Sequence, residues 1–439
     1  MPRKTKVLVL VVVLAFSLNL SAQIWGPVEK LSNAGYPCQC DMGHSHTNTV
    51  VSDGDNVYVV WRDCRQNGGM VEEIYFNKSN DGGMNWIGDM PVSNLAAGGY
   101  SSAPAVAVSG PNVHVVWSEL LGSTISTMEI FYRHSADGGA NWDPLIQLTN
   151  NQVFTDSASI AVSGDTVHIA FPDKRTGDLE LYYKVSYDNG ANWEPDLQIS
   201  NVAPDEAKFP SIAVGNGEVH IAYEISGIGG VSAYDTYFEA TDPTQRTDKL
   251  LSSTGVLPCV ASDGDNFHCV WVEKRSYPND DEIYHMMFDG SNWGSKQLVT
   301  ADQSLLYTSV SASGADVFAV FEDISALNTS DIKYIRSMDF GSTWGAESNL
   351  SNHPEESERP SIFFSGLDLH VVWCDNRNSG NFEIFYTGGV VRSWPMFHRD
   401  FRNTGRSPLV GVITSSSLTG SDLATNAPVN SSPALVDVD

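Results

Sequence analysis

Basic residues are scarce in this chain. It carries 25 lysines and arginines against 53 aspartates and glutamates, which gives a formal net charge of -28. This charge argues against nucleic acid as a partner and against adhesion to anionic lipid. An excess of carboxylates suits an extracellular protein that binds cations, so calcium is a candidate cofactor and no other is predicted. Solubility alone explains the charge equally well, because aspartate-rich turns are also ordinary hairpin chemistry.

Long hydrophobic runs are also scarce. The one candidate, residues 7–16, is too short to cross a bilayer. It follows three basic residues and precedes the small residues Ser21-Ala22-Gln23. This order is typical of a secretory signal peptide. We therefore predict a signal peptide over 1–23, a mature chain that begins near Gln23 or Ile24, no membrane span within this chain, and a secreted or cell-surface location.

A short turn, which we call the Asp turn, recurs five times, as in Ser79-x-Asp81-x-Gly83-x-x-Trp86. The Ser and Asp side chains accept hydrogen bonds from nearby backbone N–H groups, and Gly takes a backbone angle that a side chain forbids. Trp then folds back as an apolar plug. The predicted structural pairs are Asp81 and Trp86, Asp137 and Trp142, Asp188 and Trp193, Asp289 and Trp293, and Asp339 and Trp344.

Each Asp turn belongs to a longer repeat that is typical of a four-stranded antiparallel meander. The stretch from Ser157 to Tyr183 alternates β-branched and aromatic runs with a tight Gly-Asp turn and a longer loop. One aromatic residue ends the second strand of every repeat, at intervals of about fifty residues, the length of a propeller blade. These residues are Trp61, Trp117, Phe171, Tyr223, Trp271, Phe321 and Trp373. The sequence therefore predicts an all-β, seven-bladed β-propeller.

The seventh repeat lacks a fourth strand after Tyr386. The missing piece is at the other end of the chain, where the segment from Trp25 to Asn33 matches Trp142 to Asn150, the fourth strand of the second repeat. A ring closed by the N-terminal strand leaves no exposed sheet edge. We therefore expect the N-terminal strand to complete the last blade, within a propeller domain over 24–392.

The Asp turns resemble the Asp-box (BNR) repeat of the sialidase-like propeller superfamily, over nearly all of the chain between its termini. Related propellers include sialidases, other glycosidases, polysaccharide lyases and non-catalytic receptors. The resemblance implies a ligand site on the face away from the Asp boxes. It does not assign catalytic residues: the early Arg-Ile-Pro-type motif is absent, and we cannot assign a Tyr-Glu pair. The catalytic residues are therefore unknown.

The face opposite the Asp turns receives the acid-x-Arg pairs of four blades. The candidate ligand contacts are Asp63, Arg65, Asp173, Arg175, Arg275, Asp375 and Arg377, together with Tyr100, His44 and His46. Arginine pairs a sugar carboxylate in two-point fashion. Recurrence at equivalent places, however, favours structural bridges from these arginines to carboxylates at the next strand. Those expected partners are Glu73, Glu180, Glu282 and Glu383.

Six cysteines in an exported chain are expected to form disulfides. Cys259 and Cys269 flank a Gly-Asp turn symmetrically, so we expect them to face each other across one hairpin. The other candidates, which converge on the seam between the first and last blades, are Cys38, Cys40, Cys64 and Cys374. The loop Cys38-x-Cys40-Asp41-x-x-His44-x-His46 is an alternative metal site, but zinc sites usually have other spacings. We predict disulfides and no metal site.

The last part of the chain, 393–439, changes in character. A Ser/Thr-rich linker leads to the run from Ser431 to Asp439, which resembles the opening of an FG-GAP or VCBS-type repeat. We expect a linker and the truncated start of a second repeat domain, so that the propeller is a monomeric module of a larger protein. Two functions remain open: a module that binds glycan or surface protein, and a sialidase-like hydrolase that acts on acidic sugars.

Overall fold

The computed structural model describes residues 23–32, 48–66, 71–93, 99–121, 127–274, 281–302, 304–326, 329–377 and 381–391. The chain divides into two compact units, of which the larger spans Trp25–Gly389. In the described ranges the secondary structure is almost entirely strand and turn, and no helix there is long and apolar enough to span a bilayer. The predicted signal peptide up to residue 22, the whole Cys/His loop and the predicted C-terminal repeat lie outside these ranges.

The larger unit is a ring of seven antiparallel sheets, of which six are each formed by four consecutive strands and the seventh combines the last strands with the N-terminal ones. Blade 1 contains β3 (Val50–Asp53), β4 (Asn56–Gln66), β5 (Val71–Ser79) and β6 (Met90–Pro91). Blade 2 contains β7 (Ser101–Ser109), β8 (Asn112–Leu120), β9 (Met128–Ser135) and β10 (Ile146–Gln147). Blade 3 contains β11 (Ser159–Ser163), β12 (Thr166–Asp173), β13 (Glu180–Ser186) and β14 (Leu197–Gln198). Blade 4 contains β15 (Glu206–Gly215), β16 (Glu218–Gly227), β17 (Gly230–Glu239) and β18 (Arg246–Ser252).

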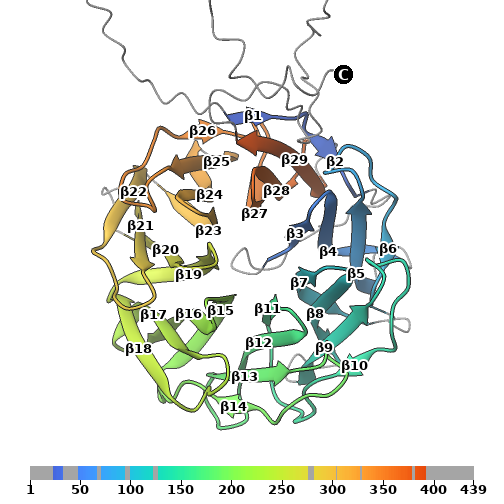
Figure 1. Cartoon of the computed structure of the whole chain (residues 1–439), viewed down its shortest axis with the longest axis vertical. Coiled ribbons are helices and arrows are strands. Elements are labelled where there is room, and N and C mark those ends of the chain that lie inside the picture. Colours follow the sequence, from blue (N-terminus) through green and yellow to red (C-terminus); the bar gives the residue numbers. More distant parts are fainter. Residues whose placement is uncertain are drawn as a thin grey trace, which may run out of the picture. The chain divides into compact units, whose positions relative to one another are not determined.

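The remaining three blades continue the ring. Blade 5 contains β19 (Gly255–Ser262), β20 (Phe267–Glu273), β21 (Asp281–Phe288) and β22 (Gln297–Asp302). Blade 6 contains β23 (Leu305–Ser313), β24 (Asp316–Ala326), β25 (Thr329–Ser337) and β26 (Ser348–Asn349). Blade 7 contains β27 (Ser357–Ser365), β28 (Asp368–Asp375) and β29 (Glu383–Val391), with β1 (Gln23–Trp25) and β2 (Glu29–Lys30). The first strand of every blade borders the centre of the ring (Figure 1). The predicted seven-bladed fold is confirmed.

The N-terminal segment closes the ring as predicted. Glu29 and Lys30 of β2 pair with Tyr386 and Phe385 of β29. The backbone N–H of Leu31 also donates to the carbonyl of Ile384, at 2.8 Å. These bonds cover the edge of β29, which is the physical advantage of a closed sheet arrangement.

The tryptophan of an Asp turn packs between neighbouring blades. Trp193 of blade 3 meets Tyr132 of blade 2 edge-on, with 5.0 Å between ring centroids. Trp25, which has no Asp turn of its own, makes the same contact with Tyr334 of blade 6 at 5.1 Å. Blade 4 lacks an Asp turn and uses Phe238 instead. The predicted equivalence of Trp25 and the Asp-turn tryptophans is therefore confirmed in its packing.

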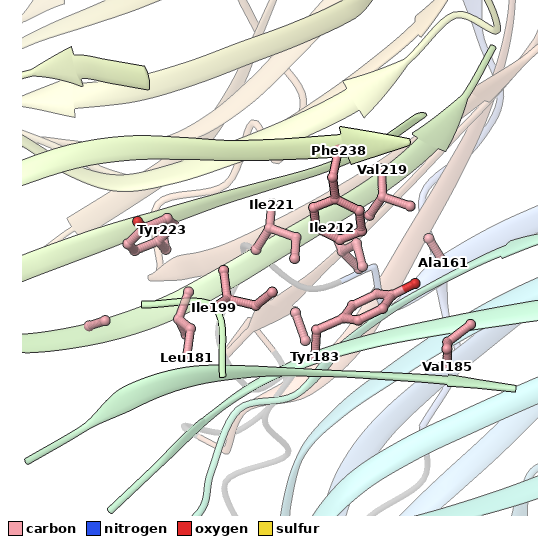
Figure 2. Close-up of a cluster of buried hydrophobic side chains, with 12 residues drawn as sticks. Ala161, Leu181, Tyr183, Val185, Ile199, Ile212, Val219, Ile221, Tyr223 and Phe238 are labelled. Atoms are coloured by element: carbon pink, nitrogen blue, oxygen red, sulfur yellow. The ribbon is translucent and has the colours of Figure 1, made fainter. Parts of the chain in front are cut away.

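The aromatic residues predicted to end the second strands lie within them instead, because each strand continues two to five residues further. They are buried in the sheet interiors, and their relative exposure does not exceed 3%. Between blades, apolar side chains from facing sheets meet, as in the cluster between blades 3 and 4. Figure 2 shows Leu181 and Tyr183 of β13 pointing toward Ile221 of β16 and Phe238 of β17. Burial of such side chains contributes about 1.5–3 kcal/mol each relative to exposure.

Hydroxyl groups on the innermost strands join several pairs of neighbouring blades. Ser159 accepts the backbone N–H of Ile212, and Ser361 accepts that of Thr49, each at 3.2 Å. The second of these bonds crosses the closure from blade 7 to blade 1. The inner wall of the ring is thus hydrogen-bonded at the seam in the same manner as between blades 3 and 4.

The predicted disulfide between Cys259 and Cys269 is wrong. Both are free thiols, because the hairpin register pairs Cys259 with Val270 and Val260 with Cys269. A register offset of one residue turns the two sulfur atoms to opposite faces of the sheet. They therefore lie in different hydrophobic clusters, Cys259 with Val270 and Cys269 with Val260.

The seam cysteines give a mixed result. Cys64 packs against the same hydrophobic cluster as Cys374 at the junction of blades 1 and 7, as expected from the closure. Cys64 is disulfide-bonded, whereas Cys374 is a buried thiol, so the prediction of a disulfide at Cys374 is wrong. Cys38 and Cys40 lie outside the described residues.

A buried histidine occupies the same position of the second strand in several blades. His168 contacts the hydroxyl of Tyr183 through Nδ1 at 2.6 Å, and His370 contacts that of Tyr386 at 2.8 Å. Burial lowers the pKa of His168 and of His370 to about 4. These imidazoles are therefore neutral at the centre of the inter-blade packing.

We expect the stability of the protein to fall with pH below about 6.5. The unfolded chain protonates its histidines near that pH, whereas the buried imidazoles stay neutral down to about pH 4, so unfolding takes up protons in this window. Replacing His168 with Phe, which the chain carries at the equivalent position Phe318, should reduce the uptake by up to about one proton. Denaturant unfolding between pH 4 and 7 measures the slope, and an unchanged slope in the variant contradicts the assignment.

Candidate functional site at the mouth of the central channel

The Asp turns and the hairpins that join the first two strands share one face of the ring. Gly82 of the first Asp turn donates its N–H to the carbonyl of Asp55 at 2.7 Å, and Gly138 of the second donates to Pro111 at 2.8 Å. The connections between second and third strands, and those between blades, lie on the other face. We call these two faces the Asp-turn face and the loop face.

In the described acid-x-Arg pairs, the arginine makes its contacts within its own blade. The guanidinium of Arg175 donates to Asp173 and to Asp196, each at 2.7 Å, and lies 4.1 Å from the ring centre of Tyr182. Arg65 likewise pairs with Asp63 and lies 4.2 Å from the ring centre of Tyr75. Each arginine is thus held by its own carboxylate and by an aromatic ring of the third strand.

The predicted bridge from Arg175 to Glu180 is wrong. Glu180 instead accepts hydrogen bonds from Ser200 and from the backbone N–H of Val202. The acid-x-Arg spacing lets the guanidinium fold back onto Asp173, which comes two residues earlier and is fully buried. Burial alone raises the pKa of Asp173, but hydrogen bonds from Arg175 and Asn151 lower it overall.

The arginines are not brought together into one site. Arg377 donates to Asp375 at 2.9 Å and lies 4.6 Å from the ring centre of Phe385, which repeats the same arrangement in blade 7. This geometry supports the structural role for the described pairs. Arg275, His44 and His46 lie outside the described residues, so their role as ligand contacts stays a prediction.

Tyr100 lies on the loop face at the junction of blades 1 and 2. Its hydroxyl accepts a hydrogen bond from Arg62 at 3.0 Å, and Arg62 also pairs with Glu72 at 2.8 Å. Tyr100 is half-buried. It therefore stays a candidate ligand contact, with a neighbouring guanidinium that sequence reasoning did not find.

A recurring backbone feature marks the loop-face end of the innermost strands. There the register of five strands shifts by a bulge, and the first unpaired residue has a positive φ. Blade 3 has a residue of the same conformation just before its first strand. These residues are Ala103, Ser157, Phe209, Leu257, Tyr307 and Arg359. Such backbone conformations are costly for residues other than glycine and cluster at functional sites.

The bulge itself recurs in most blades, but the side chains it presents differ, so the ring of bulge residues is chemically asymmetric. Its most polar part is the blade 6–7 site, formed by Tyr307, Glu322, Glu358 and Arg359. The guanidinium of Arg359 lies 5.5 Å from the ring centre of Tyr307 and 3.9 Å from Glu358. The backbone N–H of Arg359 donates to Glu322 at 3.2 Å. A phenol, a guanidinium and a buried carboxyl group thus meet at one point of the channel mouth.

Glu322 differs electrostatically from an ordinary surface carboxylate. It is only 4% exposed, and this burial raises its pKa to about 7. The N–H of Arg359 acts in the opposite direction, whereas Glu358 and Glu356 raise the pKa further. A large fraction of Glu322 is therefore protonated near neutral pH, so that it can donate a proton or a hydrogen bond.

The sequence pattern does not predict the blade 6–7 site. Two sequence features mark this site: Glu322, which follows the recurring aromatic residue of the second strand, and the pair Arg359-Pro360 before an apolar run. Farther into the ring, the innermost strands line a cavity of about 350 Å³ with small and apolar side chains such as Val106, Val162 and Val260.

Among the described residues, no group of three or more His, Cys, Asp or Glu is placed to hold a metal ion. Calcium stays a prediction.

Comparisons with known proteins place the fold. No family model matches the chain, and no curated protein matches it. Solved structures do. Polysaccharide lyase Uly1 matches 79% of this chain and 90% of its own, with 8% identity and a TM-score of 0.54. The GH93 α-L-arabinofuranosidase of Fusarium graminearum matches 83% and 97%, with 12% identity and a TM-score of 0.52.

A viral protein matches at the same level. The phage phi92 endosialidase matches 86% of this chain and 70% of its own, with 9% identity and a TM-score of 0.52. This chain shares their propeller fold. At such identities the likeness concerns the fold alone, and function depends on the residues of the site.

Proposed function

We propose that this chain is a secreted or cell-surface propeller that binds acidic glycans through its loop face. The observation that carries the proposal is the blade 6–7 site, where Arg359, Tyr307 and Glu322 meet at the channel mouth. A guanidinium pairs a sugar carboxylate in two-point fashion, and an aromatic ring offers an apolar surface to a sugar ring. The names of the three solved neighbours denote carbohydrate-active enzymes, which supports a glycan rather than a surface protein as the ligand.

Calorimetric titration with a sialylated trisaccharide, a uronic-acid trisaccharide and a neutral trisaccharide tests this function. We expect saturable binding of an acidic probe and none of the neutral one. Replacing Arg359 with Met should weaken binding about tenfold or more, because a hydrogen bond to a charged group contributes about 1.5–3 kcal/mol.

The chain offers a matched control in Arg336. This arginine pairs with Asp316 and lies 5.4 Å from the ring centre of Phe318, but at the Asp-turn end of blade 6. Replacing Arg336 with Met removes the same chemistry from the other face and should leave binding unchanged. Equal losses in both variants, or no binding of any probe on a broad glycan array, would overturn the proposed function.

Hydrolysis of acidic sugars is the second candidate function, and the protonation of Glu322 favours it. A carboxyl group with a pKa of about 7 matches the requirement for a general acid near neutral pH. Fluorogenic sialoside and uronide substrates distinguish the candidates. An enzyme turns them over and loses this activity on replacement of Glu322 with Gln while it still binds ligand. If the unmodified protein binds these substrates without turning them over, only the function as a binding module stands.

A further inference from the structure

The blade 6–7 site has a structural equivalent two blades away. Glu224 directly follows the buried aromatic residue Tyr223 within β16, as Glu322 follows Phe321 within β24. It accepts the backbone N–H of the bulge residue in the next blade, Leu257, at 3.1 Å, as Glu322 accepts that of Arg359. Burial raises the pKa of Glu224 as well. The same arrangement of carboxyl group and bulge therefore occurs at two places on the channel mouth.

The side chains beside Glu224 are also suited to a ligand. Phe209 is the bulge residue of β15 and corresponds to Tyr307, and these two are the aromatic members of the bulge set in the described residues. Lys208 precedes Phe209 and pairs with Glu206 at 2.6 Å, and Lys174 also contacts Glu206, at 3.0 Å. We call Lys208, Phe209, Glu224 and Leu257 the blade 4–5 site. Each site thus combines an aromatic ring, a cationic group and a buried carboxyl group.

A projecting hairpin borders the blade 4–5 site. Strands β16 and β17 stay paired from Tyr223 and Tyr234 out to Gly227 and Gly230, so this connection rises as a continuous ribbon. Ile228 at its tip is 97% exposed. The start of β15, including Lys208, pairs with the same ribbon at Glu224. The ribbon forms a wall beside the second site.

We propose that the blade 4–5 site is a second subsite for the same ligand, so that the chain recognises an acidic oligosaccharide long enough to reach both sites. This inference rests on the proposed function. Lys208 faces the negatively charged groups of the sugar chain, Phe209 stacks against a ring, and Arg359 and Tyr307 hold a residue farther along the same chain. A single terminal sugar occupies one site and gains nothing from the other.

A length series tests the subsite. Uronic-acid and sialic-acid oligomers of two to eight residues are titrated into the full chain, and affinity should rise at least tenfold between the shortest and the longest binder. The test variant replaces Lys208 with Leu and Phe209 with Ala, residues that the chain itself carries at the equivalent positions 306 and 103. Position 103 also has a positive φ, so the substitution suits the local backbone.

In this variant the affinity for the long oligomer should fall to that for the short one, while binding of the short oligomer stays unchanged and still depends on Arg359. An equal loss for short and long ligands, or an unchanged dependence on length, overturns the subsite but leaves the proposed function standing. Absence of binding at every length in the unmodified protein overturns the proposed function, and the subsite with it. Thermal unfolding of the variant confirms that it is folded.

Discussion

Replacing Gly83 with Ala lowers the free energy of unfolding by about 2–5 kcal/mol. Gly83 lies in the Asp turn of blade 1 with φ +88°, and an added Cβ atom meets the hydroxyl of Tyr386 at 1.9 Å. Tyr386 cannot easily move, because it is buried and its hydroxyl bonds to His370 and to the carbonyl of Gly82. The expected loss combines about 1–2 kcal/mol of left-handed backbone strain with about 1–3 kcal/mol of overpacking.

Gly54 supplies the matched control in the same blade. It also has a positive φ, +57°, but an added Cβ atom there has no neighbour within 4 Å. Its replacement with Ala should cost only the backbone strain of about 1–2 kcal/mol. Chemical denaturation measures both variants, and the difference between them reports the contact across the seam. Equal losses would show that the Asp turn of blade 1 does not depend on close packing against blade 7.

Removing residues 23–32 abolishes the cooperative native state. The deletion exposes the edge of β29 and removes the buried Leu31, several backbone hydrogen bonds and the contact of Trp25 with Tyr334. Burial of a leucine contributes about 1.5–3 kcal/mol and each net hydrogen bond about 1 kcal/mol, so the loss is about 5 kcal/mol or more. This is comparable to the whole stability of many domains. Thermal unfolding and light scattering measure the loss and the expected aggregation through the exposed edge.

Two point variants in the same segment give the deletion a control. Leu31 is buried and Val28 is 37% exposed, so replacing Leu31 with Asp should strongly destabilise the ring, whereas replacing Val28 with Asp should change the midpoint little. A stable, monomeric protein after the deletion, or equal effects of the two point variants, contradicts closure by the N-terminal segment.

The sequence predicts the architecture because every blade repeats the same pattern of strands, turns and a buried aromatic residue. The buried aromatic residue of the second strand recurs in all seven blades, and Trp25-Gly26-Pro27 carries the same signal as Trp142-Asp143-Pro144. Repetition thus reveals both the number of sheets and the way in which they close. The predicted features that depend on repeat position, such as the shared face of Asp turns and hairpins, follow from the meander.

Features that depend on register or on single side chains are harder to predict. The symmetric spacing of Cys259 and Cys269 suggests a direct pair, but the four-residue turn shifts the register by one. For Arg175 the sequence indicates a carboxylate partner without distinguishing Glu180 from Asp173 and Asp196. In the sequence the bulges are marked only weakly, by a bulge residue that precedes proline in several blades. The blade 6–7 site is therefore recognised from the fold and not from a sequence motif.

Hydrogen exchange with a bound acidic oligosaccharide tests recognition by the loop face most directly. Backbone amides around Tyr307 and Arg359 should exchange more slowly in the complex, and those around Phe209 should follow when the oligomer is long. The Asp turns, including Gly83 and Gly190, should keep their exchange rates. Protection of the Asp turns with no change at Tyr307 and Arg359 would contradict the account and move recognition to the opposite face.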